Sequence, residues 1–263
     1  MDGAGKMGYY DLTKEERQNL VLEMKDEIIK DLESGENTSI LLYSSDEDVY
    51  IRKNISNILG KTYREQNLFK EEIIHLAVQL LKNDDEKVRQ TAVYILGEIG
   101  KQDAEPVFDY LEIALEDPHY RVRNTVMSSL KVMGQKNPKP TLIFAKAFIH
   151  HPNPEVRKKV IHGIELRGRT HPEDVLPLLE ELQDEDNPQV RKMLIHVIGQ
   201  ISYKKGCLEK VTSTLKTWKN RKLVEDTIPY ILEVHKNYPF SAMTPEEAKK
   251  YLKTNFNEYN IQF

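Results

Sequence analysis

Four arginines spaced 34 residues apart most limit how this chain can fold. Each follows a valine and opens an apolar run: Arg89, Arg123, Arg157 and Arg191. A weaker member, Ile51-Arg52, lies 37 residues before Arg89. A constant period of about 20 to 50 residues is typical of proteins built from stacked structural repeats. The spacing therefore predicts a repeat array.

The residues around each arginine predict two helices per repeat. From Val88 to Ile99, apolar residues recur at the i, i+4, i+7, i+11 spacing of a helix with one buried side. Asp or Asn, often followed by Pro, precedes the arginines and suits a helix N-terminus. A second apolar segment between copies, such as 172–182, completes a helical hairpin. Three glycines, each 11 residues after its arginine, fit helix C-termini: Gly100, Gly134 and Gly168.

These motifs resemble a known repeat family. The start Asn153-Pro-Glu-Val-Arg157 and the run Leu96-Gly-Glu-Ile-Gly100 look like parts of the HEAT repeat. The resemblance covers roughly residues 40–236. It implies an all-α fold, a right-handed α-α superhelix of the HEAT/armadillo type with about six helical hairpins. It also implies that the second helix of each hairpin lines the concave side.

The pattern predicts one solenoid over residues 1–236. Thr13 and Glu16 form a capping-box sequence, which predicts an N-terminal capping helix over about 12–33. Pro229 is expected to kink the second helix of the last hairpin or displace its start. Residues 237–263 are expected to form a linker, a short helix and a tail, the tail being either an end cap or flexible.

Charge and cysteine content limit the classes of function. The net charge of −4 argues against a general binder of polyanions, so any nucleic-acid role needs a local basic surface. Cys207 is the single cysteine, which excludes an internal disulfide and indicates a reducing interior. No signal-like start and no long apolar stretch is present in the sequence. We therefore expect a cytoplasmic protein without a membrane partner.

The candidate binding surface is a stripe along the second helices. Offsets +1, +5, +8 and +12 from each arginine fall on one helix side. Of these 20 positions, seven are Lys or Arg and one, Glu165, is acidic. Such a stripe suits phosphates or an acidic protein surface, although ordinary solvated helix faces explain it equally well. The candidate binding residues are Lys53, Arg64, Tyr94, Lys101, Lys131, Lys158, His162, Arg169, Lys192, His196 and Tyr203.

The arginines that define the period are assigned a structural role. A guanidinium repeated beside Asp or Asn typically links neighbouring repeats by bidentate hydrogen bonds. We call this set the arginine ladder: Arg52, Arg89, Arg123, Arg157 and Arg191.

No metal site or cofactor is predicted. His162 and His196 share an offset in adjacent repeats, and the usual helix spacing of about 8–10 Å is too wide for shared coordination without further ligands. The pair instead suits hydrogen bonding or stacking on the binding face. Phosphate-loop, nucleophile-elbow and Cys-x-x-Cys motifs are absent from the sequence. No small-molecule substrate is evident.

A second resemblance raises the question of DNA. The segments 175–183, 187–202 and 215–218 are similar in order and spacing to bacterial alkylpurine DNA glycosylases built from HEAT-like repeats. That family implies a basic channel for duplex DNA, with aromatic residues, a carboxylate and an arginine around the lesion. Here the only tryptophan is Trp218, and Gly199 and Gln200 stand where the arginine would be expected. The resemblance therefore implies a fold relation and DNA binding, but not catalysis.

Two functions follow from the sequence. The first is a non-enzymatic interaction module that binds a protein partner on its concave, locally basic face. The alternative is a DNA-binding protein related to the HEAT-like DNA repair glycosylases, which requires Tyr94 and Tyr203 to be exposed. A subunit of a larger assembly would instead carry an apolar patch on an end or on the convex face.

Overall fold

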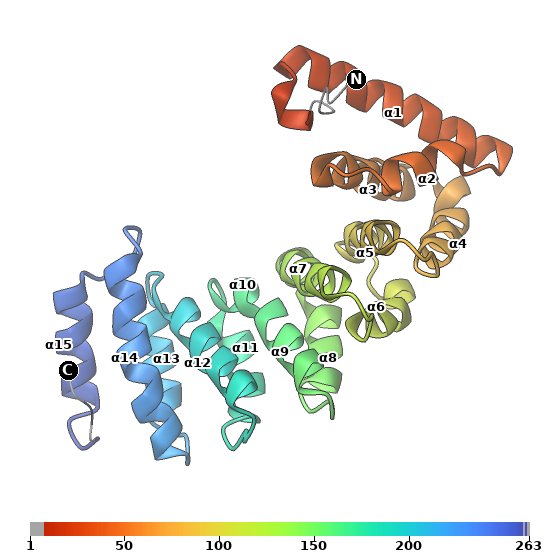
Figure 1. Ribbon diagram of the computed structural model, residues 1–263. Coiled ribbons are helices and arrows are strands. Elements are labelled where there is room, and N and C mark those ends of the chain that lie inside the picture. Colours follow the sequence, from red (N-terminus) through yellow and green to blue (C-terminus); the bar gives the residue numbers. More distant parts are fainter. Residues whose placement is uncertain (1–7, 260, 262–263) are drawn as a thin grey trace, which may run out of the picture. The chain divides into compact units, whose positions relative to one another are not determined.

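The computed structural model describes residues 8–259 and residue 261 (Figure 1). These residues form helices and connecting turns, and no β-strand occurs among them. The predicted all-α fold of the HEAT/armadillo solenoid type is confirmed. The chain forms two compact units, which divide between Ser129 and Leu130 inside helix α7 (Tyr120–Lys136). The single solenoid over 1–236 stays a prediction, and its first seven residues lie outside the described residues.

The first unit consists of a capping helix followed by paired helices. Helix α1 contacts α2 and α3, and α5 contacts α2, α3 and α4. The predicted capping box is present, because Thr13 Oγ1 accepts from Glu16 N at 3.2 Å and Glu16 accepts from Thr13 N at 2.7 Å. The helices before α7 are α1 (Lys14–Ser34), α2 (Thr38–Ser44), α3 (Val49–Glu65), α4 (Lys70–Leu80), α5 (Glu86–Gly100) and α6 (Phe108–Leu115), with short 3-10 turns Tyr9–Asp11, Asn67–Phe69 and Glu105–Val107.

The second unit repeats the hairpin arrangement in two layers. Helices α8, α11 and α13 contact one another in series, and α9, α12 and α14 do the same (Figure 1). We call α7 from Leu130 onward, with α9, α10, α12 and α14, the second-helix layer. The bounds are α8 (Pro138–Phe148), α9 (Pro154–Gly163), α10 (Glu165–Gly168), α11 (Pro172–Glu180), α12 (Pro188–Ser202), α13 (Cys207–Leu215), α14 (Arg221–Asn237) and α15 (Pro245–Asn255).

The last helix closes the second unit. Thr244 and Glu247 form a capping box at the start of α15, and α15 packs against α14. Phe256 is fully buried, and its ring meets Tyr259 edge-on. Of the two alternatives for the tail, the described part up to Tyr259 therefore forms an end cap. Pro229 does not displace the start of α14, which begins at Arg221 and continues through the proline, and the kink stays a prediction.

Several glycines let neighbouring helices approach closely. The structure also corrects the prediction that Gly100, Gly134 and Gly168 cap helix C-termini. Gly134 lies inside α7, and Gly100 and Gly168 lack the positive φ of a left-handed cap. A Cβ on Gly168 would lie 2.6 Å from Ile201 Cγ2, and one on Gly163 would lie 2.8 Å from Leu130 Cβ. These positions require glycine because the facing helix fills the space of a side chain.

None of the helices within the described residues combines the length and apolar character needed to cross a bilayer.

Candidate functional site

A buried carboxylate lies at the centre of the second-helix layer. The Glu165 side chain is 1% exposed, and four basic or imidazole side chains approach it. Its Oε2 atom lies 3.0 Å from His162 Nε2, 3.5 Å from His196 Nε2 and 3.5 Å from Lys131 Nζ. Arg169 Nη2 contacts the other oxygen, Oε1. We call these five residues the Glu165 cluster.

The repeat architecture brings the cluster together from three successive hairpins. Glu165 lies three residues after His162 and four before Arg169, so the three side chains share one helix side. His196 projects from α12, and Asn187 fixes the start of that helix by accepting from the backbone N–H of Gln189 and Val190. Lys131 comes from α7, which approaches α9 closely at Gly163.

The electrostatics of the cluster hold Glu165 ionised. Burial alone would raise the pKa of Glu165, but the adjacent imidazoles of His162 and His196 and the cations of Lys131 and Arg169 outweigh burial. The pKa of Glu165 therefore lies well below its usual range. Burial lowers the pKa of Lys131, and the negative charge of Glu165 only partly offsets that effect. Apart from the two imidazoles, the cluster contains one carboxylate and two cations, so these three groups sum to a net positive charge.

Hydrogen bonds from neighbouring residues orient these side chains, and two of those residues were not predicted from the sequence. Arg169 donates to Gln200 Oε1 at 2.7 Å, and His196 Nδ1 lies 2.7 Å from the Tyr230 hydroxyl. Tyr230 follows His196 by 34 residues, so one further step of the repeat period would have identified it. Gln200 lies at offset +9, one residue beside the predicted stripe.

Several predicted stripe positions are less accessible than expected, among them Gln90, Glu165 and Tyr203. Tyr203 is only 9% exposed, because its ring stacks on Tyr238 at 5.1 Å and receives the Arg169 guanidinium at 5.7 Å. Glu165 is buried although its offset placed it on a solvated stripe. The requirement of the DNA alternative for an exposed Tyr203 is therefore not met.

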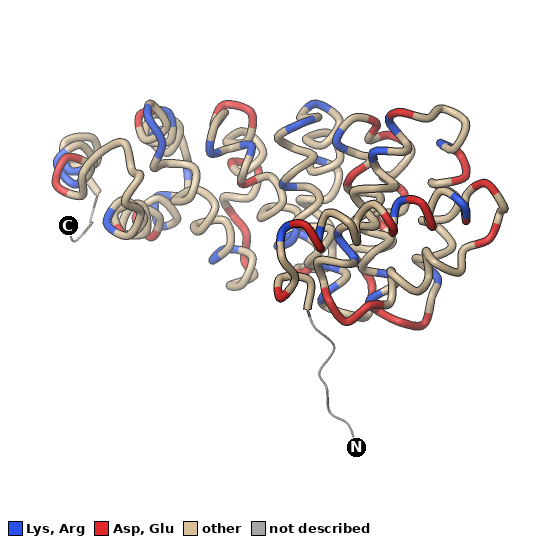
Figure 2. Tube along the Cα trace, turned by 90° about the horizontal axis from the view of Figure 1, so that it is seen from above, with Lys and Arg blue, Asp and Glu red and all other residues tan. Residues whose placement is uncertain are grey.

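The stripe of the first unit is partly neutralised. Glu98, at offset +9, pairs with Lys101 and lies 4.0 Å from Arg64. Lys53 is exposed, and its ammonium lies near the rings of Tyr50 and of the half-buried Tyr94, at 5.7 and 5.6 Å. Basic and acidic residues are interspersed along the chain (Figure 2). The first unit therefore offers a weaker basic surface than its sequence suggested.

The remaining stripe residues lie on α9 and α12. Lys158 pairs with Glu155 at 2.6 Å, one turn earlier on α9. Lys192 is exposed on α12. Both residues lie on the same layer as the Glu165 cluster.

The arginine ladder makes contacts within and between repeats. Arg89 donates to both carboxylate oxygens of Asp117 at 2.7 and 3.1 Å, and Arg157 does so to Glu185 at 2.8 and 2.7 Å. Arg191 pairs with Asp226 at 2.9 Å, whereas Arg123 donates to the backbone carbonyl of Asp117 at 2.6 Å. These contacts favour the structural role proposed for the ladder.

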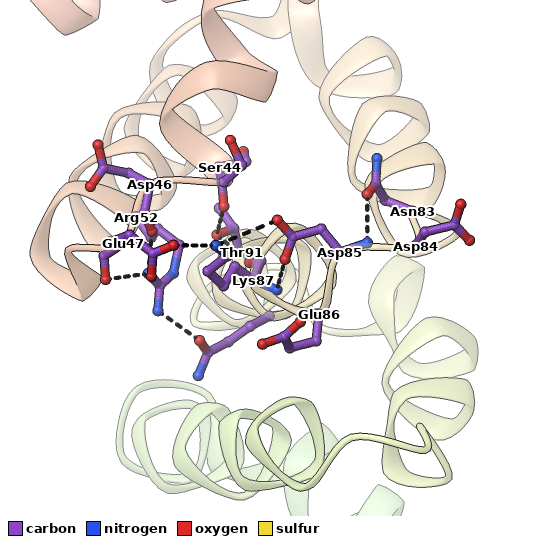
Figure 3. Close-up of polar contacts among 12 residues, drawn as sticks. Ser44, Asp46, Glu47, Arg52, Asn83, Asp84, Asp85, Glu86, Lys87 and Thr91 are labelled. Carbon is purple, nitrogen blue, oxygen red and sulfur yellow. Dashed lines mark hydrogen bonds and ion pairs between the residues drawn. The ribbon is translucent and has the colours of Figure 1, made fainter.

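Figure 3 shows the first such connection in the first unit. Arg52 donates to the carbonyls of Asp46 and Glu47, and its other nitrogen reaches Gln90 Oε1 at 3.0 Å. Lys87 pairs with Glu47 at 2.7 Å, which links the start of α5 to the turn before α3. These polar contacts join neighbouring hairpins at the helix starts.

The two histidines lie closer together than the helix spacing suggested. Their ring centroids are 5.6 Å apart, because both side chains lean toward Glu165. The candidate ligand atoms of His162, Glu165 and His196 all lie within 4.8 Å of one another. The two rings therefore lie closer together than the helix spacing assumed in the argument against shared coordination, and a carboxylate lies beside both of them.

Large exposed apolar side chains occur on several elements, and some of them lie close together in the first unit. Among the described residues they include Leu42 on α2, Ile113 on α6, Ile143 on α8 and Phe240 after α14. The rings of the exposed residues Tyr10 and Tyr50 lie 4.4 Å apart, and Tyr10 and Leu22 line one cavity beside α1. The first unit therefore carries an apolar patch of the kind that the assembly-subunit alternative requires.

Comparisons with known proteins agree with the fold. Residues 38–131 match the family model of HEAT repeats, and no curated protein matches the chain. The structure of AlkD2 from Streptococcus mutans gives a TM-score of 0.55 at 18% identity, covering 79% of this chain and 97% of that one. The structure of smu.31 from Streptococcus mutans UA159 gives 0.49 at 22% identity, covering 67% and 97%. The resemblance to HEAT repeats is confirmed, and at these identities the likeness to solved structures shows the fold alone.

Proposed function

We propose that this protein is a non-enzymatic interaction module whose second-helix layer binds an acidic segment of a protein partner. The observation that carries the proposal is the Glu165 cluster. Its buried carboxylate holds Lys131 and Arg169 in place, with the imidazoles of His162 and His196 at the open side. Cations that are already positioned lose little side-chain entropy when they bind carboxylates.

The neighbouring charges extend this surface. Lys192 is exposed on α12, and Lys158 on α9 is held by a surface pair that an acidic partner can replace. Positive charges at the rim of an interface mainly increase the association rate and make binding dependent on salt. The surface therefore suits a partner that presents several carboxylates in succession.

The test is binding of a fluorescent poly-glutamate peptide over a salt series. We expect saturable binding that weakens as salt rises, and about tenfold weaker binding in Lys158→Glu/Lys192→Glu, or about 1.4 kcal/mol. The control is Lys249→Glu/Lys250→Glu, which makes the same charge change on exposed positions of α15. Equal losses in both variants, or no binding to the wild-type chain at low salt, would contradict the proposal.

The second candidate is binding of duplex DNA. It is supported by the resemblance of segments 175–183, 187–202 and 215–218 to the HEAT-like glycosylases, and at the level of fold by AlkD2. The burial of Tyr203 and the neutralising Glu98 weigh against it. A fluorescent duplex in the same salt series separates the two candidates. Duplex binding with a steep salt dependence that Lys158→Glu/Lys192→Glu reduces, without peptide binding, would favour DNA.

A further inference from the structure

Two histidines and a glutamate in the Glu165 cluster are arranged as metal ligands. His162 Nε2 and His196 Nε2 approach the same carboxylate oxygen, Glu165 Oε2, at 3.0 and 3.5 Å. Ligand atoms about 2.0–2.1 Å from a tetrahedral Zn²⁺ ion lie about 3.3 Å from one another. The two measured distances lie on either side of that value, so small side-chain shifts suffice to place an ion between the three atoms.

The surroundings of the three ligands fit a metal site in two further respects. Glu165 Oε2 is buried and accepts no hydrogen bond of good geometry, although three nitrogens lie within 3.5 Å. The Tyr230 hydroxyl lies 2.7 Å from His196 Nδ1, which leaves Nε2 facing the carboxylate. Metal-bound histidines commonly use their second nitrogen for such an orienting hydrogen bond.

The exposure of the ligands provides an entry path. The His162 and His196 side chains are 25% and 35% exposed, whereas Glu165 is 1% exposed. An ion would therefore bind from the imidazole side and retain water or a partner's ligand at the open positions.

From this geometry we propose that His162, Glu165 and His196 bind a divalent first-row transition metal, with Zn²⁺ as the preferred ion. Two imidazoles and one carboxylate favour Zn²⁺ over Mg²⁺ or Ca²⁺, which prefer oxygen ligands.

Two cations in the cluster influence this site differently. Arg169 contacts Oε1, so it can remain as a hydrogen-bond donor to a carboxylate that binds the ion through Oε2. Lys131 lies 3.5 Å from Oε2 and therefore competes with the ion for the same atom. Removing the charge of Lys131 should strengthen metal binding. If the cluster had only a structural role, the same change would not increase the affinity for metal.

The experiment is calorimetric titration of the full chain, without an affinity tag, with Zn²⁺, together with absorption spectra of the Co²⁺ form. We expect one equivalent to bind. The variants His162→Ala and His196→Ala should lose the saturable binding, and Tyr230→Phe should bind about tenfold more weakly. Lys131→Met should bind several-fold more tightly, an outcome that misfolding cannot produce.

His150 provides a matched control. Its Nε2 lies 3.0 Å from Glu181 Oε2, the same spacing as in the His162 pair, but the described residues place no third ligand there. His150→Ala should therefore retain the single equivalent, with the unfolding temperature of each variant measured in parallel. Absence of Zn²⁺ binding by the wild-type chain would overturn the proposal, as would an equivalent that survives in His162→Ala or disappears in His150→Ala. The proposal does not depend on which partner occupies the second-helix layer.

Discussion

At the scale of single residues, the contacts between repeats rest on a few nearly buried ion pairs. In the Arg157–Glu185 pair the side chains are 15% and 8% exposed, and two parallel hydrogen bonds join them. Burial would raise the pKa of Glu185, but the hydrogen bonds from Arg157 and from the Asn187 N–H outweigh it and leave the pKa lowered. Such a pair contributes stability only while the carboxylate is ionised.

The variant Glu185→Gln should therefore lose stability in a pH-dependent way. At pH 7 we expect a loss of about 3 kcal/mol, because Arg157 keeps its charge without a counter-ion. A lowered carboxyl pKa stabilises the fold above its ordinary value of 4.5 and ceases to do so as pH falls through the folded value. The difference in unfolding free energy between variant and wild type should therefore shrink as the pH falls from about 5 to about 3. Urea unfolding at several pH values measures it.

The surface pair of Lys158 and Glu155 provides the comparison. Glu155 is 45% exposed, so Glu155→Gln should cost less than about 1 kcal/mol. A constant loss for Glu185→Gln across the pH range would show that its ionisation is not involved.

At the scale of helices, close packing depends on particular glycines. Gly134 and Gly168 have the same offset from their arginines, but their environments differ. A Cβ on Gly168 meets Ile201 Cγ2 at 2.6 Å, whereas a Cβ on Gly134 finds its nearest neighbour at 3.6 Å. Of these two glycines, Gly168 alone lies where a facing helix leaves no room for a methyl group.

The same substitution should therefore have opposite effects at the two positions. Gly168→Ala should destabilise the protein by about 1–3 kcal/mol, because Ile201 is fully buried and has little room to move. Gly134→Ala should be neutral or stabilising by up to about 1 kcal/mol, since alanine favours helix. Thermal and urea unfolding of both variants gives the comparison. A stabilising Gly168→Ala would refute the close packing of α10 against α12.

At the scale of the whole molecule, each repeat of an array is stabilised mainly by its contacts with the neighbouring repeats. Helix α12 packs against α9 and α14 inside the second unit, and α5 packs against α3 inside the first. Leu194 of α12 is fully buried. Its truncation should therefore affect its own unit most.

Leu194→Ala should cost about 2–5 kcal/mol through loss of buried apolar contacts. Hydrogen exchange followed by mass spectrometry should show faster exchange in peptides from α9, α12 and α14. Peptides from α3 and α5 should keep most of their protection. An equal loss of protection in all five helices would mean that the two units unfold as one cooperative structure.

The sequence by itself determined the all-α repeat fold, the helical hairpins and the cap at Thr13. These features follow from short-range patterns, because capping and helical periodicity act over a few residues. The period also placed His162 and His196 at equivalent positions in adjacent repeats.

Only the tertiary structure decided what those positions do. The burial of Glu165, the approach of Lys131 and the close imidazoles depend on how far apart helices of different hairpins lie. That distance is determined by packing at contacts such as Gly163 against Leu130, and a repeat period carries no information about it. The same packing buried Tyr203 and brought Glu98 of α5 to 4.0 Å from Arg64 of α3. A stripe of charges in the sequence thus became one compact cluster and one partly neutralised surface.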